Sequence, residues 1–90
     1  MYHVILSPKA AKFLNALDRK RRLKIIGVLK DLADYPFALK RHDVKKIEGR
    51  QSTFRVRLGG IRAIFYVDKE NERIVILKMD SRESVYDYTG

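Results

Sequence analysis

The chain of 90 residues contains no cysteine. Disulfide frameworks and thiolate metal sites are therefore excluded, while the redox compartment stays open. Long hydrophobic runs are missing as well, because no segment approaches the roughly 20 apolar residues of a membrane span. The N-terminal run Met1–Leu6 is too short for a signal peptide and is followed by Ser7-Pro8. We therefore expect a cytoplasmic protein with no membrane partner.

Acidic residues are few relative to basic ones. The sequence has 11 Asp and Glu against 20 Lys and Arg, which gives a formal net charge of +9 and a pI near 10.0. An excess of Lys and Arg is the first sign of a nucleic-acid-binding face. An acidic protein or an anionic membrane surface would attract the same charge, so the composition indicates a polyanionic partner without naming it.

Internal repeats, low-complexity tracts and linkers are also absent, and we expect a single domain over residues 1–90. The spacing of apolar residues predicts a strand at Tyr2–Leu6 and a helix that is capped by Ser7 and ends near Leu17. A second helix, capped by Asp18, ends at Tyr35-Pro36. The hydrophobic period then changes to two, which predicts strands over residues 44–48, 54–58, 61–67 and 73–79.

This order of elements predicts an α+β fold. It consists of an N-terminal strand, an antiparallel two-helix hairpin, and a mostly antiparallel sheet of four or five strands in a meander. The helices should cover one face of the sheet and leave the other open. The open face is where function is to be sought.

Gly59-Gly60 is a two-residue hairpin signal that fixes the register of the flanking strands. It pairs Leu58 with Ile61, Arg57 with Arg62, Val56 with Ala63, and Arg55 with Ile64. Alternation sends one set of side chains to the helix side of the sheet: Phe54, Val56, Leu58, Ile61, Ala63 and Phe65. The other set faces away from the helices: Arg55, Arg57, Arg62, Ile64 and Tyr66.

Two arginines opposite each other destabilise a sheet, so folding alone would not choose the Arg57–Arg62 pair. A bound phosphate chain would reverse the sign of that effect, since guanidinium groups make bidentate hydrogen bonds to phosphate. The alternative is a solvated strand face, or arginines neutralised by acidic residues of a neighbouring element. Both interpretations stay open.

A second basic cluster lies at the start of the second predicted helix, where the helix dipole disfavours positive charge. It could dock on ribosomal RNA or DNA, or it could serve only to keep the helix end soluble. The cluster consists of Arg19, Lys20, Arg21, Arg22 and Lys24.

Motifs for metal or nucleophile chemistry are missing. His3 and His42 are isolated, no HExxH or paired-aspartate pattern occurs, and no serine stands in a GxSxG elbow. We interpret His3 as a strand residue and His42 as a loop residue, and expect no metal and no cofactor. RNA cleavage remains possible without them, because the 2′-hydroxyl of the substrate can act as the nucleophile. The protein then needs only to orient it, stabilise the charged phosphorane and move protons.

Three segments together resemble the RelE-type toxins of the RelE/ParE superfamily, over nearly the whole chain. They are Lys46-Ile47-Glu48-Gly49, the stretch from Phe54 to Phe65, and the ending Arg82-Glu83-Ser84-Val85-Tyr86. The resemblance implies a metal-independent mRNA interferase, the toxin of a type II toxin–antitoxin system. Such a toxin is an endoribonuclease that cuts translated mRNA in the ribosomal A site and leaves a 2′,3′-cyclic phosphate and a 5′-hydroxyl.

The same resemblance implies roles for individual residues. Arg62 would contact the scissile phosphate, Arg82 would lie near the leaving group, and Tyr86 would stack on the nucleotide or transfer a proton. Arg55 and Arg57 would bind substrate by electrostatics, because arginine is effectively never deprotonated. Tyr88 lies two residues beyond Tyr86 and could exchange roles with it, and either tyrosine could instead pack on the strand edge.

The resemblance also implies partners. A RelB-like antitoxin, acidic or amphipathic, would wrap the toxin, and operator DNA would be bound only together with that antitoxin. The ribosome and its mRNA would be the target. Two alternatives remain open: a ParE-like inhibitor of DNA gyrase, and a basic binding module without catalysis.

Overall fold

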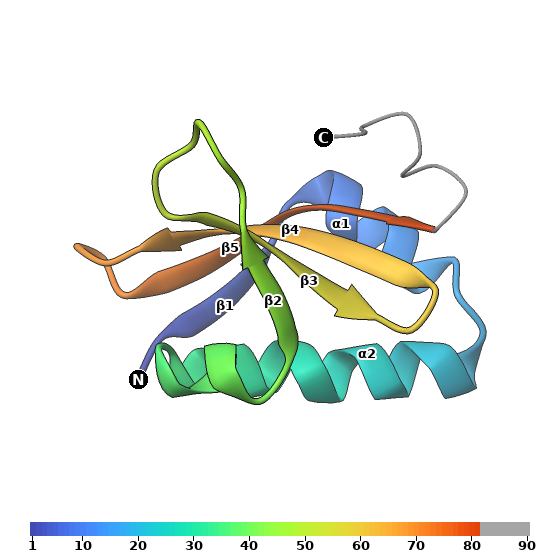
Figure 1. Ribbon diagram of the computed structural model, residues 1–90. Helices are drawn as coiled ribbons and strands as arrows, with labels where there is room; N and C mark the ends of the chain where they lie inside the picture. The colour runs from blue at the N-terminus through green and yellow to red at the C-terminus, as the bar shows by residue number, and fades with distance from the viewer. Residues whose placement is uncertain (82–90) are drawn as a thin grey trace.

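A computed structural model describes residues 1–81 as two helices and a five-stranded mixed sheet of order β1-β5-β4-β3-β2 (Figure 1). The α+β fold predicted from the sequence is confirmed. The helical segments are α1 (Pro8–Asn15), α2 (Arg19–Asp31) and the 3-10 turns Leu32–Asp34 and Phe37–Lys40. The strands are β1 (His3–Leu6), β2 (Asp43–Lys46), β3 (Thr53–Leu58), β4 (Ile61–Asp68) and β5 (Arg73–Ser81).

Both α-helices start at the residues that the sequence predicts. Ser7 Oγ accepts a hydrogen bond of 3.1 Å from the Ala10 amide, and Pro8 follows as the first helical residue. The Asp18 carboxylate accepts one of 3.1 Å from the Arg21 amide. The second helix continues into a 3-10 turn before the cis peptide bond Tyr35-Pro36.

The β3–β4 hairpin has the predicted register. Leu58 pairs with Ile61, Arg57 with Arg62, and so on outward from Gly59-Gly60. Gly59 has a φ of +70°, a conformation in which glycine carries no steric penalty. The predicted division of the two faces is confirmed as well, since Val56, Ile61, Ala63 and Phe65 are all buried.

Two features of the sheet were not predicted. The first strand pairs in parallel with β5, from His3 opposite Arg73 to Leu6 opposite Ile76. The β4–β5 ladder shifts register by one residue between Ile64 and Phe65, which leaves Leu77 as the extra residue of a bulge. Ser7 is hydrogen-bonded at this point, its amide donating to the Ile76 carbonyl and its hydroxyl to the Leu77 carbonyl, at 2.9 and 2.8 Å.

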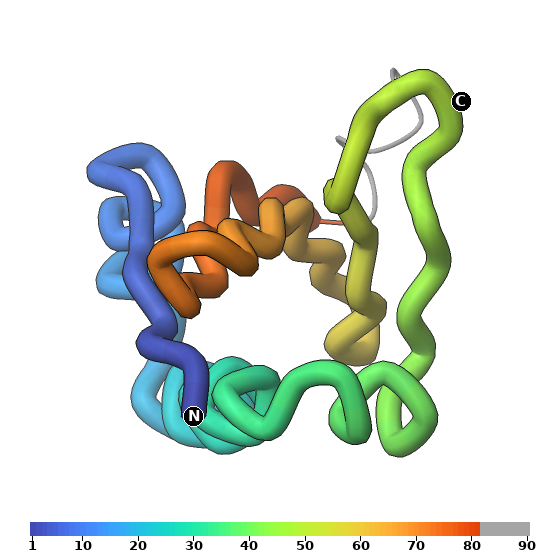
Figure 2. The backbone as a smooth tube through the Cα atoms, turned by 90° about the vertical axis from the view of Figure 1, so that its left-hand side faces the viewer, coloured from blue at the N-terminus to red at the C-terminus, as the bar shows by residue number. Residues whose placement is uncertain are grey.

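The core lies between the sheet and α2, which runs across one face of the sheet (Figure 2). Ile25 and Leu29 of α2 are buried against the sheet, and α1 continues from β1 alongside β5. Phe65 is fully buried and stacks on Phe54 with ring centroids 5.4 Å apart. Over residues 1–81, the opposite face of the sheet carries no helix, and no helix is long and apolar enough to cross a membrane.

Candidate functional site

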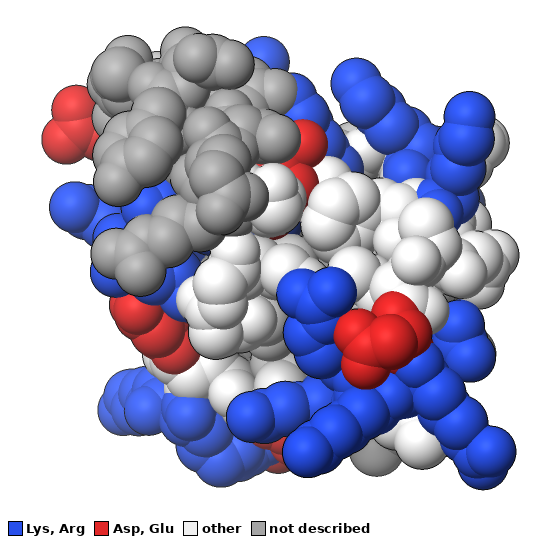
Figure 3. Space-filling model, turned by 90° about the vertical axis from the view of Figure 1, so that its right-hand side faces the viewer, with Lys and Arg blue, Asp and Glu red and all other residues white. Residues whose placement is uncertain are grey.

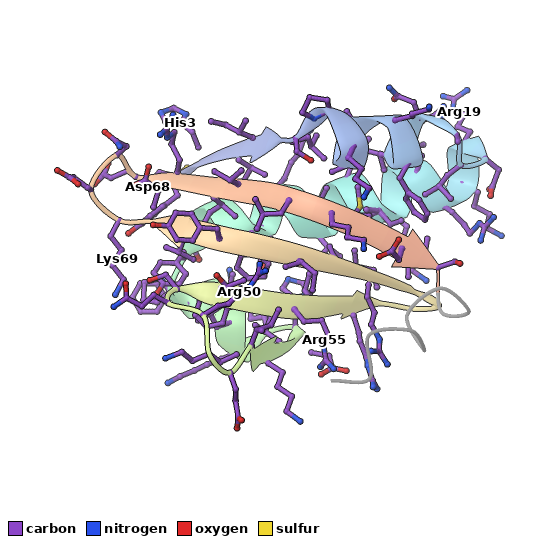
Figure 4. All side chains as sticks on the ribbon, turned by 90° about the horizontal axis from the view of Figure 1, so that it is seen from above. His3, Arg19, Arg50, Arg55, Asp68 and Lys69 are labelled. Atoms are coloured by element: carbon purple, nitrogen blue, oxygen red, sulfur yellow. The ribbon has the colours of Figure 1, made fainter. Side chains whose placement is uncertain are left out.

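The sheet face that carries no helix within residues 1–81 is seen from above in Figure 4. It carries two neighbouring rows of mostly charged side chains at the end near the β3–β4 turn. We call them the first and second charged rows. The first contains, from β2 to β5, Asp43, Arg57, Arg62 and Asp80. The second contains the cations Lys45, Arg55 and Lys78, with the uncharged Ile64 at the β4 position. The cations outnumber the carboxylates in these rows, so the surface is an electropositive patch on the open face.

Asp43 is shared between two arginines of β3. Its carboxylate lies 3.4 Å from Arg55 Nη2 and 3.9 Å from Arg57 Nε. The Asp43 side chain is 58% exposed, so solvent weakens both contacts. The arginines are thus partly neutralised by a neighbouring strand, which is one of the alternatives left open by the sequence.

Arg55 is more enclosed than Arg57 and Lys78, two other cations of the patch. Its side chain is only 16% exposed, and its buried Nε has no hydrogen-bond partner in the described part of the chain. Burial lowers the pKa of Arg55 below its usual value; repulsion from Arg57 and Arg62 lowers it further, and Asp43 raises it. The guanidinium nevertheless stays charged. A bound anion at Arg55 would therefore relieve an unfavourable charge and satisfy a buried donor.

Arg62 lies between a like and an opposite charge. It pairs across strands with Arg57 on one side and with Asp80 on the other. Asp80 makes its ion pair with Lys78, at 3.4 Å, and over residues 1–81 no carboxylate lies within 4.0 Å of the Arg62 guanidinium. Arg62 is thus less neutralised than its neighbour Arg57.

A small hollow of about 80 Å³ lies at the β3–β4 turn, between the two arginines of the first charged row. Its walls are Arg57, Gly59, Gly60 and Arg62. A Cβ added at either glycine would meet open space, so the turn backbone is accessible from solvent. Two guanidinium groups beside bare backbone suit an oxyanion such as a phosphate.

A second, larger hollow of about 610 Å³ borders the β2–β3 loop, which rises above the sheet in Figure 1. Lys45, Lys46 and Arg50 supply three cations to its lining, against one acidic residue, Glu48. Figure 4 shows Arg50 beside β3, as it does Arg55. The electropositive surface therefore extends from the patch to this loop.

In the predicted basic cluster at the start of α2, two members bind neighbouring groups of the protein and three are exposed to solvent. The Arg22 guanidinium donates hydrogen bonds to the carbonyls of Asn15 (3.5 Å) and Leu17 (3.1 Å), where α1 ends. Arg21 forms an ion pair of 2.7 Å with Asp18. The other three members, Arg19, Lys20 and Lys24, are exposed, and Figure 3 shows Lys and Arg side chains around the margin of this side of the molecule.

The two histidines do not meet. His3 lies on β1, as expected for a strand residue, and is exposed. His42 precedes β2, and its Nε2 lies 2.7 Å from an Asp31 carboxylate oxygen. Arg41 binds the same carboxylate through two hydrogen bonds, of 2.9 and 3.1 Å, and reaches Asp34 at 2.8 Å. This network joins α2 to the segment before β2.

The structure brings Arg55, Arg57 and Arg62 together. The three remaining site residues of the prediction, Arg82, Tyr86 and Tyr88, lie outside the described residues 1–81. Among residues 1–81, no group of three or more His, Asp or Glu side chains is arranged to hold a metal ion.

Sequence reasoning missed Asp43 and Asp80, the two carboxylates at the ends of the first charged row. For Asp80 a signal was present: after Ile74 and Ile76 a strict period of two would place Lys78 and Asp80 in the core, which indicates a bulge before them. Asp43 depends on the β2–β3 register, and residues 47–52 form a loop without a short turn signal.

Comparisons with family models, curated proteins and solved structures relate this chain to known proteins. A family model described as the ParE toxin of the type II toxin–antitoxin system parDE matches residues 4–86. A curated protein of Methanocaldococcus jannaschii, named as the candidate toxin RelE1, is 26% identical over 94% of this chain and 94% of its own.

Two solved structures of toxin–antitoxin complexes have the same fold. The chain matched in the RelE–RelB complex of Pyrococcus horikoshii is 28% identical, with a TM-score of 0.75 over 90% of this chain and 94% of that one. The chain matched in RelBE2 of Mycobacterium tuberculosis is 27% identical, with a TM-score of 0.73 over 90% of this chain and 98% of that one. Because the family model spans most of the chain, this protein belongs to the ParE toxin family, within the RelE/ParE superfamily of type II toxin–antitoxin toxins.

Proposed function

We propose that this toxin is a ribosome-dependent endoribonuclease that cuts translated mRNA in the A site. One observation carries the proposal. Within residues 1–81, Arg57 and Arg62 face each other on the sheet face that carries no helix, next to the enclosed Arg55, whose Nε has no hydrogen-bond partner there. Asp43 and Asp80 offset the repulsion between these cations only in part, and a bound phosphate chain would remove the remainder.

In the proposed reaction the 2′-oxygen of the substrate attacks the adjacent phosphorus. The O2′–P bond forms while the P–O5′ bond breaks, which leaves a 2′,3′-cyclic phosphate and a 5′-hydroxyl. A base takes the 2′-proton, and an acid gives a proton to the departing 5′-oxygen. The phosphorane between these states carries extra negative charge, and this is where fixed cations contribute most.

We assign Arg62 to the scissile phosphate, because it is the less neutralised arginine at the small hollow. Arg55 and Arg57 bind neighbouring phosphates and hold the strand in register. For the remaining steps we propose Tyr86 as the proton-transfer group, Arg82 at the leaving oxygen, and Tyr88 as a further substrate contact.

The proposal includes a cognate RelB-like antitoxin and action in the cytoplasm. The relatives from Pyrococcus and Mycobacterium were solved as complexes with antitoxins. An acidic or amphipathic segment would be attracted by the net charge of +9 and could cover the electropositive patch. Operator DNA would be bound only by the toxin and antitoxin together.

The alternative is a ParE-like gyrase inhibitor that does not cut nucleic acid, and the family model favours it by its description. Primer extension on a translated message after induction separates the two. Breaks within codons, dependent on translation and relieved by co-expression of the cognate antitoxin, support the ribonuclease. Intact mRNA together with arrested replication would contradict the ribonuclease and support gyrase inhibition.

A further inference from the structure

Tyr66 of β4 is an exposed aromatic on the open face that the proposed chemistry does not use. It lies on the same strand and face as Arg62, four residues further along, which places the two about 13 Å apart at the usual rise of a strand. Ile64 lies between them and pairs with Arg55. A strand of nucleic acid held at Arg62 and Arg55 would therefore be directed toward the Tyr66 ring.

The Tyr66 side chain is only partly engaged by the fold. The side chain is 39% exposed, and its hydroxyl makes no hydrogen bond within residues 1–81. Tyr2, Tyr35, Phe54 and Phe65 contact one another in a chain of aromatic pairs, whereas Tyr66 has no aromatic neighbour in the described part of the chain.

Tyr66 and its cross-strand neighbours form a floor of one aromatic, one threonine and two aliphatic side chains, and the threonine hydroxyl is occupied by its hydrogen bond to the Gln51 carbonyl. Its cross-strand neighbours are Thr53 of β3 and Val75 of β5, and beyond Val75 lies Ile5 of β1, which is 40% exposed. A flat ring on aliphatic neighbours is the kind of surface on which a nucleobase stacks.

The positive charge around Tyr66 indicates which class of ligand binds there. On one side, the floor borders Arg55 and Lys78 of the second charged row. Next to Tyr66, the Val67 amide donates a hydrogen bond to the carbonyl of Ser52, which connects β4 to the basic β2–β3 loop. An aromatic platform beside cations fits a nucleic-acid strand, since the phosphates bind the cations and the base stacks on the ring.

We propose that Tyr66 is the stacking platform for a base of the bound mRNA at a position next to the scissile phosphate, where it adds affinity for the presence of a base. The inference rests on the proposed ribonuclease function. It adds a base-binding subsite to a site that otherwise binds only the backbone.

The test uses ribosomes programmed with a short mRNA in which single positions around the cut are made abasic. Tyr66→Ala should lower kcat/KM by about tenfold on the intact mRNA. Tyr66→Phe keeps the ring and should match the wild type. Phe37→Ala, which removes an exposed aromatic from the 3-10 turn Phe37–Lys40, is the control and should also be unaffected.

The decisive result is that the effects of removing the base and of removing the Tyr66 ring on the cleavage rate are not additive. At one position the abasic mRNA should slow the wild type by about tenfold and slow Tyr66→Ala no further, because the base then has no ring to stack on. Independent effects at every position would overturn the subsite. So would a Tyr66→Ala protein that cuts normally but loses its antitoxin, because the floor would then be a protein-docking surface.

Failure of the proposed function can be told apart in the same complexes. An mRNA carrying the fluorescent base 2-aminopurine reports stacking by quenching, whether or not it is cut. If the wild type quenches at one position and Tyr66→Ala does not, yet no cut appears, then the subsite stands and the ribonuclease proposal falls. If the wild type cuts but no position shows quenching that depends on Tyr66, the subsite alone is wrong.

Discussion

At the scale of single residues, Asp43 has two opposed effects. It is the carboxylate nearest to Arg55 and Arg57, and so it lowers the cost of placing these cations on one face. It also competes with any phosphate for the same guanidinium groups. One side chain therefore balances stability of the fold against strength of anion binding.

Asp43→Asn should shift that balance. We expect a lower melting temperature, with a loss of up to about 1 kcal/mol because the contacts are solvent-exposed. RNA affinity should rise a few-fold, since two arginines become available. Thermal unfolding and RNA binding of the same variant measure both effects. A variant that is destabilised and also binds RNA more weakly would contradict competition and indicate that Asp43 orients the arginines for binding.

At the scale of elements, the end of α2 is tied to the segment before β2 by the network of Asp31, Arg41 and His42. Hydrogen bonds from Arg41, and then from His42, lower the pKa of Asp31 below its usual value of 3.8. A carboxyl whose pKa is lower in the folded state stabilises the fold above the unfolded-state pKa. This stabilisation is lost as the pH falls through the folded-state pKa.

Asp31→Asn should accordingly lower the melting temperature at neutral pH and make the acid-induced loss of stability below about pH 4 shallower. Melting curves from pH 2 to 7 for the wild type and the variant measure this difference. Asp34→Asn is the matched control, because among residues 1–81 the Asp34 carboxylate pairs with Arg41 and not with His42, and its loss should have the smaller effect. Parallel pH profiles for the wild type and Asp31→Asn would show that the network contributes nothing.

Arg22 and Lys20 offer a second contrast between neighbours on α2. Arg22→Ala removes the donor at the end of α1 and should cost about 1 kcal/mol of stability, whereas Lys20→Ala should leave the melting temperature unchanged. If the basic cluster docks on the ribosome, Lys20→Ala should instead weaken ribosome binding more than the cleavage step. Equal melting temperatures for both variants would show that the Arg22 contact does not stabilise the helix end.

How far the sequence predicts the fold depends on how local each signal is. The register of Arg57 and Arg62 follows from Gly59-Gly60 alone, because two residues close the hairpin. The parallel pairing of β1 with β5 joins residues about seventy positions apart, and no local turn specifies it. The bulge at Leu77 turns Met79 into the core and Asp80 onto the open face, so a strict period of two would have placed both side chains wrongly.

At the scale of the whole molecule, the net charge of +9 is not spread at random, since the open face gathers cations from β2, β3, β4 and β5. Each phosphate neutralised on single-stranded RNA contributes roughly 0.7 to the slope of log affinity against log salt. We expect RNA binding to weaken steeply with salt, and Arg57→Gln to reduce the slope by about one phosphate equivalent. Binding titrations from 50 to 300 mM salt measure the slope, and a flat profile would contradict an electrostatic interface.

The most direct test of the account is the cleavage rate of Arg62→Ala on programmed ribosomes, with the melting temperature measured on the same sample. Loss of charge stabilisation in the transition state should cost about 2 to 4 kcal/mol, or roughly 30- to 1,000-fold in rate. Stability should stay within a few tenths of a kcal/mol, because Arg62 faces one like charge and one opposite charge. Arg73→Ala, which removes an open-face arginine paired with Asp68 at the other end of the sheet, should keep its activity. A fully active Arg62→Ala protein, or an inactive one that has also lost its fold, would contradict the assignment of Arg62 to the scissile phosphate.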